Sequence, residues 1–319
     1  MFLTFVGLDT AALTSIAAFV PNLRHLSLHH AGKATNETLE YYAEKLLKLT
    51  SFHIRGAFLV SRDAYVQFVT NLGPRLESLT ISSTARTNSA VIEAIGKHCP
   101  NLRHLTLSHL ARLDDEALTY LYPLTNLETL DISYAGTTLT DEGIAKLLDH
   151  IGSSLTTLNL AGNISLSTPA IQSIHACCAA LQNLDLTELE LVGNDDIKAL
   201  FTNWGKNRGL HELRMSRLIE LQDDALIAVV KHSGQTLEVL EVNSCHDFTK
   251  AGMLEALGYC KRLRVFDAGF VRSVDDDVVL KMQDVGVKKL EVWGCTKVTE
   301  CVDIASGVSL VGREADIAA

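Results

Sequence analysis

The amino-acid sequence predicts an α/β solenoid of about 11–12 repeats, each consisting of a short strand, a loop and a helix. The first observation is a frame LxxLxL that recurs eleven times at spacings of 24 to 29 residues. The second is an apolar spacing typical of a helix after each frame, as at Ile144, Leu147 and Leu148. One such unit cannot bury its own apolar face, so the units must stack on one another. The frame begins at Leu23, Leu49, Leu76, Leu102, Leu127, Leu155, Leu181, Leu210, Leu237, Leu263 and Val287.

Each repeat can be interpreted element by element, counting its first frame residue as position 1. Positions 1, 4 and 6 face inward from a strand, and positions 3, 5, 7 and 8 face outward. An acidic or hydroxyl residue then caps a helix of about ten residues, as in Leu139-Thr140-Asp141-Glu142. Period and pattern together are those of leucine-rich repeats, which predicts a horseshoe with parallel strands on the concave face and helices on the convex face. Position 9 carries a small or apolar residue: Ala31, Ala57, Thr84, Ala135, Cys245 or Cys295.

Both ends of the chain fit the same frame. Leu3 and Phe5 match positions 4 and 6 of a repeat whose first residue would be residue 0, and residues 308–312 match a last short strand. The chain contains no Pro-rich or Gly/Ser-rich linker, so we expect residues 1–319 to form a single solenoid domain. A solenoid that starts inside a strand has no N-terminal cap, so we also expect that the chain lacks its natural N-terminal region.

The net charge of −10 argues against non-specific nucleic-acid binding, which requires clustered Lys and Arg. Twelve acidic residues lie in short runs at predicted helix N-termini, where they cap N–H groups and favour the helix dipole. The acidity therefore needs no functional explanation. The segment MFLTFVGLDTAALTSIAAFVPN has no Lys or Arg before Arg24, so it lacks the charged start of a signal peptide. No other segment is long and apolar enough for a membrane span.

The cysteines support a repeat interpretation more than a metal site. No CxxC spacing occurs, and five of the seven cysteines fall on two recurring positions. Cys99, Cys178 and Cys260 each precede a frame leucine by three residues, while Cys245 and Cys295 occupy position 9. We expect buried, reduced thiols. Cys301 falls on neither position.

Catalytic motifs are absent: no HExxH, P-loop, GxSxG or GxGxxG occurs, so we predict no enzyme activity and no cofactor. Six histidines occupy outward positions of the first four repeats: His25, His29, His30, His53, His104 and His109. They are interpreted as a polar ligand-facing surface, with a zinc cluster or a pH-sensitive patch as alternatives.

The outward strand positions decide what such a protein binds. They carry seven acids against four bases, or −3, with the acids concentrated in the later repeats. We therefore expect a protein partner with a basic segment there, ordinary solvated side chains being the alternative. Phe270 and Trp293 end neighbouring strands and form either an aromatic anchor or a cover over the last core layer. The candidate partner-binding residues are Phe270, Arg272, Trp293, Arg214, Arg217, Glu241, Asp267 and Tyr134.

The cysteine-containing repeat pattern resembles that of F-box/LRR substrate receptors. The C-terminal segments FVRSVDDDVV, GVKKLEVWGCTKVTE and GVSLVGRE are similar to those of the fungal radiation-sensitivity leucine-rich repeat proteins of nucleotide excision repair. This resemblance implies a nuclear scaffold and substrate-recognition subunit in global-genome repair. It also implies a Snf2-type ATPase and an XPC-type damage sensor as partners, with an elongin C–cullin ubiquitin ligase bound through the missing upstream region. DNA would be contacted only indirectly or weakly.

Two other functions stay open at this stage. One is an F-box/LRR-type receptor or mitotic-exit regulator with a target outside repair. The other is direct DNA binding, which would make affinity strongly salt-dependent and which the −3 balance of the outward positions disfavours.

Overall fold

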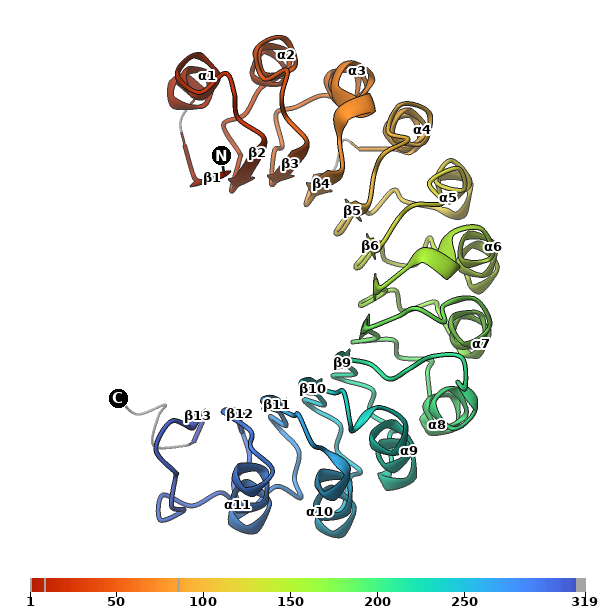
Figure 1. The fold of residues 1–319 in the computed structure, drawn as a ribbon, viewed down its shortest axis with the longest axis vertical. Coiled ribbons are helices and arrows are strands. Elements are labelled where there is room, and N and C mark those ends of the chain that lie inside the picture. Colours follow the sequence, from red (N-terminus) through yellow and green to blue (C-terminus); the bar gives the residue numbers. More distant parts are fainter. Residues whose placement is uncertain (1, 9, 85–86, 314–319) are drawn as a thin grey trace. The chain divides into compact units, whose positions relative to one another are not determined.

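The computed structural model describes residues 2–8, 10–84 and 87–313. The chain forms two compact units, residues 1–155 and 156–319, which are described separately. In each unit the strands are parallel and follow one another in sequence order, and the helices cover one side of the sheet (Figure 1). This arrangement confirms the predicted leucine-rich repeat fold, while the single domain over 1–319 stays a prediction. Within the described residues, no helix reaches the length and apolarity needed to cross a membrane.

The first unit alternates strands with helices. The strands are β1 (Phe2–Val6), β2 (His25–His29), β3 (Ser51–Arg55), β4 (Ser78–Ser82), β5 (His104–Thr106) and β6 (Thr129–Asp131). The helices are α1 (Thr10–Phe19), α2 (Asn36–Lys45), α3 (Arg62–Leu72), α4 (Ser89–His98), α5 (Asp115–Thr119) and α6 (Asp141–Ile151). Short 3₁₀ turns follow α3 at Gly73–Arg75 and α6 at Gly152–Ser154.

The second unit repeats this plan and ends on a strand. The strands are β7 (Thr157–Asn159), β8 (Asn183–Asp185), β9 (Glu212–Arg214), β10 (Val239–Glu241), β11 (Val265–Asp267), β12 (Lys289–Glu291) and β13 (Ser309–Val311). The helices are α7 (Thr168–Cys177), α8 (Asn194–Asn203), α9 (Asp223–Ser233), α10 (Lys250–Tyr259) and α11 (Asp276–Asp284).

Inward-facing aliphatic side chains pair in register and form the core. In the second unit Leu213, Leu240, Phe266 and Leu290 face one another across four strands, and each is at most 2% exposed. The first residues pair as expected, with Leu3 opposite Leu26 on β2. The predicted last strand is also confirmed, as β13 pairs with β12. The frame therefore places every repeat correctly.

Position 8 adopts the left-handed backbone conformation throughout the repeats. Phe270, for example, has φ 59°, and its N–H donates to the carbonyl of Trp293 in the next repeat. Glycines fill the position in some repeats, as at Gly162 and Gly294. The non-glycine examples are His30, Ser83, His109, Tyr134, Glu188, Arg217, Ser244 and Phe270. This conformation costs a non-glycine residue roughly 1–2 kcal/mol, so the repeat geometry imposes it on the sequence.

Aspartates in the first helical turn connect successive repeats. Asp223, at the start of α9, accepts hydrogen bonds from the Thr249 backbone N–H at 2.8 Å and its hydroxyl at 2.6 Å. Thr249 is the N-cap residue of the next helix, α10. The carboxylate needs space beside that helix, because a Cβ at Gly252 would lie 2.0 Å from the Asp223 Cγ. The same bonds join Asp115 to Thr140 and Asp276 to Thr299.

The cysteines behave as predicted. The five at recurring positions are buried and unbridged, and Cys301 is exposed. Burial raises the pKa of the Cys99 and Cys245 thiols to about 12, so both are neutral. At position 9 the thiol also joins neighbouring repeats by a hydrogen bond. Cys245 Sγ donates to the Met215 carbonyl at 3.3 Å, and Cys295 Sγ donates to the Ala268 carbonyl at 3.2 Å.

We expect Asp223→Ala to lower the free energy of unfolding by about 1–3 kcal/mol, because it leaves two donors of Thr249 without their partner. Urea denaturation followed by circular dichroism measures the change. Asp247→Ala, at an exposed aspartate outside this connection, is the matched control and should change stability by less than about 0.5 kcal/mol. Equal stability of the two variants would refute the role of the carboxylate.

Candidate partner-binding surface

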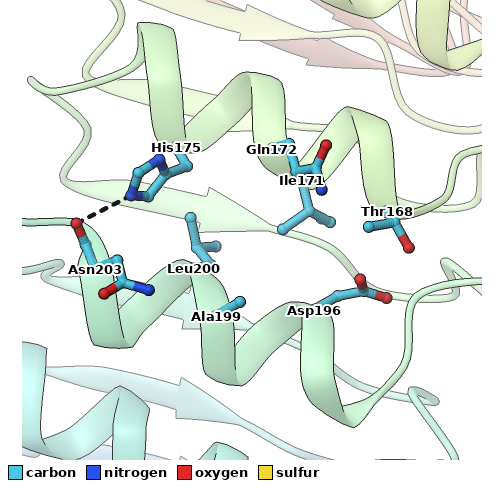
Figure 2. A pocket seen from close by; sticks show the side chains of 8 residues that line it. All are labelled: Thr168, Ile171, Gln172, His175, Asp196, Ala199, Leu200 and Asn203. Carbon is cyan, nitrogen blue, oxygen red and sulfur yellow. Dashed lines mark hydrogen bonds between the residues drawn. The ribbon is translucent and has the colours of Figure 1, made fainter.

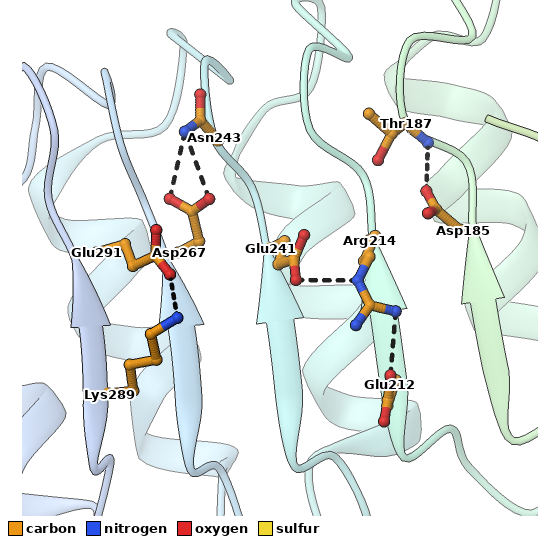
Figure 3. Close-up of polar contacts among 9 residues, drawn as sticks. All are labelled: Asp185, Thr187, Glu212, Arg214, Glu241, Asn243, Asp267, Lys289 and Glu291. Carbon is orange, nitrogen blue, oxygen red and sulfur yellow. Dashed lines mark hydrogen bonds and ion pairs between the residues drawn. The ribbon is translucent and has the colours of Figure 1, made fainter. Parts of the chain in front are cut away.

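A row of charged side chains crosses five strands of the second unit. Asp185, Arg214, Glu241, Asp267 and Glu291 all occupy position 5 and stand opposite one another on β8 to β12 (Figure 3). Parallel strands lie about 4.8 Å apart, so neighbouring charges in the row interact. The row holds four carboxylates and one guanidinium. We call this row, together with the other charged residues at the outward positions of these repeats, the acidic surface. These other residues are Glu188, Glu212, Arg217 and Lys289.

Arg214 lies between two carboxylates of the acidic surface. Its Nε is 2.9 Å from Glu241 Oε1, and its Nη1 is 3.0 Å from Glu212 Oε2 (Figure 3). Burial works against the cation, but the two carboxylates outweigh it, and the pKa of Arg214 is raised. Arg214 was predicted to contact a partner. The structure places its guanidinium in contact with these two side chains, and the partner contact stays a prediction.

The Asp267 carboxylate accepts a hydrogen bond from the backbone of the loop that follows β11. Its Oδ1 accepts the Gly269 N–H at 2.9 Å, which ends the strand with a tight turn. The Asn243 amide donates to both oxygens at 3.3 and 3.4 Å (Figure 3). Within the described part of the chain Asp267 makes no ion pair. Lys289 attracts this carboxylate but pairs with Glu291, so the charge of Asp267 is only partly compensated.

Two carboxyl groups in the row have raised pKa values, so their ionisation lowers the stability of the fold. Burial raises the pKa of Glu241, and the charges of Asp267 and Asp185 act in the same direction, while Arg214 opposes them. Burial likewise raises the pKa of Asp267, reinforced by Glu291 and opposed by the Gly269 N–H. Both groups bind protons more tightly in the folded state than in the unfolded state, so their ionised forms lower stability.

Aromatic side chains border the acidic surface at the ends of β11 and β12. Phe270 is 52% exposed, as predicted. Its ring lies against Gly294, where a Cβ would be 2.4 Å from the ring. Trp293, for which an anchor and a cover over the last core layer were both left open, is partly buried, because it packs on Gly312, where a Cβ would lie 2.6 Å from the indole. Phe270 is thus the accessible aromatic of the pair.

The remaining predicted residues are spread over the two units. Arg217, at position 8, pairs with Glu188 at 2.8 Å. Arg272 is exposed in the loop after Phe270. Tyr134 belongs to the first unit, where its ring stacks on His109 at a centroid distance of 4.6 Å. The structure therefore brings Arg214, Glu241, Asp267, Phe270 and Trp293 onto one sheet face and does not place Tyr134 in that unit.

The outward histidines of the first unit lie among hydroxyl groups. The His53 ring is 2.8 Å from the Ser51 and Thr80 hydroxyls and 3.3 Å from the Ser78 hydroxyl. Burial lowers the pKa of His53, and the nearby cationic groups of Arg55 and of other histidines act in the same direction. No group of three His, Cys, Asp or Glu side chains gathers for a metal ion anywhere in the described ranges.

A shallow hollow lies between α7 and α8 on the helix side of the second unit (Figure 2). Its volume is about 180 Å³, below the range of about 300–1,000 Å³ usual for small-molecule sites. The His175 Nε2 is 3.0 Å from the Asn203 carbonyl at its edge, and Ile171 and Leu200 form its floor. His175 is thus held by a backbone carbonyl, and the hollow brings no pair of acid–base groups together.

The sequence did not indicate how the acidic surface is held together. Asn243 and Glu212 fix its geometry, but neither was a candidate residue. Their alternation with buried Val242 and Leu213 marked them as outward-facing, and that was the available signal. Their partners lie one repeat away, beyond what local spacing reveals.

The comparisons with known proteins agree with this fold. "DNA repair protein rhp7" of Schizosaccharomyces pombe is 34% identical over 307 residues, covering 95% of this chain and 54% of the relative. "DNA repair protein RAD7" of Saccharomyces cerevisiae is 32% identical over 314 residues, covering 95% of this chain and 55% of the relative. The crystal structure of the yeast Rad7 and Elc1 complex matches with a TM-score of 0.87 at 28% identity, covering 98% of this chain and 81% of that chain.

These similarities confirm the resemblance predicted from the C-terminal segments. No protein-family model matches the chain. The chain spans about half the length of each of the two relatives, so they contain further sequence outside the matched region.

We expect Asp267→Asn to raise the free energy of unfolding at neutral pH, because the amide still accepts the Gly269 N–H and carries no charge. The gain should stay below about 1 kcal/mol, since the site is partly exposed and screened. It should shrink as the pH falls through the raised pKa of Asp267, where the wild-type carboxyl becomes neutral. Urea titrations at several pH values test this, with Asp303→Asn, at an exposed aspartate, as the control. A loss of stability at neutral pH would contradict it.

Proposed function

We propose that this chain, a leucine-rich repeat homologue of the DNA repair proteins Rad7 and rhp7, acts as a protein-interaction scaffold and substrate-recognition subunit in nuclear global-genome nucleotide excision repair. The observation that carries the proposal is the extent of the similarity. It covers 95% of the chain in sequence and 98% in structure, so it includes every repeat rather than the fold pattern alone.

The partner set follows from the same similarity. The solved Rad7 structure is a complex with Elc1, an elongin C, which supports a protein partner of this kind. We propose that elongin C and a cullin ligase bind through sequence that the relatives have outside the matched region. A Snf2-type ATPase and an XPC-type damage sensor would complete the complex, as the resemblance implies. We assign the chain no catalytic reaction, and its role is to bring partners together.

The acidic surface is the part of this chain that we propose for partner binding. Outward positions of the second unit carry six carboxylates and three cations, and each cation is already paired within the unit. A basic protein segment would supply the missing positive charge. Duplex DNA would meet the same negative surface and be repelled, so contact with DNA through partners is favoured.

Two features of the acidic surface lower the stability of the fold. Glu241 and Asp267 retain charges whose ionisation is disfavoured by burial. Phe270 keeps a bulky exposed side chain at a left-handed position that glycine would occupy without strain. Features that cost stability concentrate at functional sites, which supports a binding role for this face.

The proposed function can be tested with a chimera in fission yeast. The region of rhp7 that matches this chain is replaced by residues 1–319, and survival after ultraviolet irradiation is measured in a strain without rhp7. We expect the chimera to restore most of the survival, because the chain would supply the same scaffold to the same partners. A stable chimera that restores no survival, and captures cell-cycle regulators in place of repair factors, would favour the F-box/LRR-type alternative.

We expect Phe270→Gly to weaken partner capture at least about tenfold while leaving stability unchanged or improved. The ring is an exposed anchor, and glycine relieves the left-handed strain. Retention of nuclear proteins by the wild-type and variant chains, quantified by mass spectrometry, measures the effect. Leu280→Ala removes a 42%-exposed apolar side chain from α11, the helix after Phe270, and should leave capture unchanged. Equal capture by all three chains would show that Phe270 does not contribute to partner binding.

A further inference from the structure

A second candidate binding site lies in the first unit, at the ends of β2, β3 and β4. It is a cavity of about 480 Å³, within the size range of ligand pockets. The lining includes His29, His30, Arg55, Gly56, Phe58 and Ser83.

The polar groups of this cavity are those that bind anions. Among the residues that the structure describes, a guanidinium, two imidazoles and a hydroxyl line it, without a carboxylate. Arg55 ends β3 opposite Ser82 on β4, and its side chain is exposed. The guanidinium makes no hydrogen bond or ion pair with any side chain in the described part of the chain, in contrast to Arg214 and Arg217 of the second unit. Its five donors are therefore available to a ligand.

The electrostatic surroundings of the cavity also favour an anion. The charges acting on His53, beside Arg55 on the same strand, are those of Arg55, His29, His25 and His104, and all of them lower its pKa. The outward positions of β1 to β5 thus present only basic and neutral groups. The described residues that line the cavity are basic or neutral, so a bound anion would be attracted by Arg55 and the neighbouring imidazoles.

A glycine occupies position 8 at the centre of the cavity lining. Gly56 lies between His30 and Ser83 in neighbouring repeats, and all three have left-handed backbones. Without a side chain, Gly56 leaves its position beside the Phe58 ring open, where a Cβ would lie 3.8 Å from the ring. Phe58 is 58% exposed and forms an apolar wall beside the cations.

We propose that this cavity binds a phosphate monoester, carried by a phosphoserine or phosphothreonine of a protein partner. One planar guanidinium matches one phosphate group bidentately, and the imidazoles and the Ser83 hydroxyl can hold its remaining oxygen atoms. Nucleic acid fits less well, because it requires several phosphate contacts and a basic surface, whereas the described lining holds one arginine and the chain has a net charge of −10.

The side chains that a peptide could reach beside the cavity are Arg55 and Phe58. Both are exposed, whereas the Ser51 and Thr80 hydroxyls are buried and hold the His53 ring. An extended segment can place its phosphate at Arg55 and an apolar side chain against Phe58, and phosphorylated segments are commonly recognised by arginine in this way. The site shares no residue with the acidic surface, so it stands independently of the assignment to DNA repair.

The test uses the purified 319-residue chain, immobilised and offered two degenerate peptide libraries. One library carries a fixed phosphoserine or phosphothreonine, and the other carries serine or threonine at the same place. We expect the phosphorylated library to be captured at least about tenfold more strongly, as hydrogen bonds to a charged group imply. Inorganic phosphate should compete for the site. Equal capture of the two libraries would overturn the proposal.

Three variants assign the binding to the cavity. Arg55→Ala should abolish the preference for phosphorylated peptides, and Arg55→Lys should restore only part of it, because lysine lacks the bidentate geometry. Arg112→Ala, at an exposed arginine of the same unit outside the cavity, should keep the full preference. All variants must melt at the wild-type temperature. A preference that survives Arg55→Ala, or one displaced by a short single-stranded oligonucleotide more readily than by phosphopeptide, would reject this site.

Discussion

The left-handed residue at position 8 is the constraint on which the other features of the repeats depend. It follows the end of each strand, and in most repeats its N–H donates to the position-7 carbonyl of the next repeat, as Arg217 does to Asn243 at 2.7 Å. The bond joins neighbouring repeats and turns the chain away from the sheet, so the side chain at this position stands at the edge of the sheet face. The candidate binding groups follow from it: Phe270 borders the acidic surface, and His30, Gly56 and Ser83 form the cavity of the first unit.

The acidic surface can be understood as a balance between folding and binding. Arg214 offsets part of the repulsion by pairing with Glu212 and Glu241, but Asp267 forms no ion pair within the described residues. In the free chain the resulting cost appears as raised pKa values. A basic partner would remove this cost on binding, because its cations stabilise the ionised carboxylates, so free energy lost in folding would be recovered in the complex.

The sequence predicted the features that depend on periodicity and missed those that depend on contacts between repeats. Register, buried leucines and the position of Cys245 followed from the frame, because each reflects one residue facing one side of a strand. The bond from Asp223 to Thr249 could not be predicted, since the two residues are 26 positions apart and each also fits a role in its own helix. The contact of Trp293 with Gly312 could not be predicted for the same reason, because Gly312 lies in the next repeat, directly after β13.

The repeat separates the residues that stabilise the fold from those that can recognise a partner. Leu240 and Glu241 are adjacent in sequence, yet one is 2% exposed in the core and the other lies on the acidic surface. Since each repeat contacts only its neighbours, a change at an outward position alters local charge without disturbing distant repeats. The two units could thus acquire different surfaces on one scaffold, imidazole and hydroxyl groups around Arg55 in the first and carboxylates around Arg214 in the second. Binding by one surface therefore does not require the chemistry of the other.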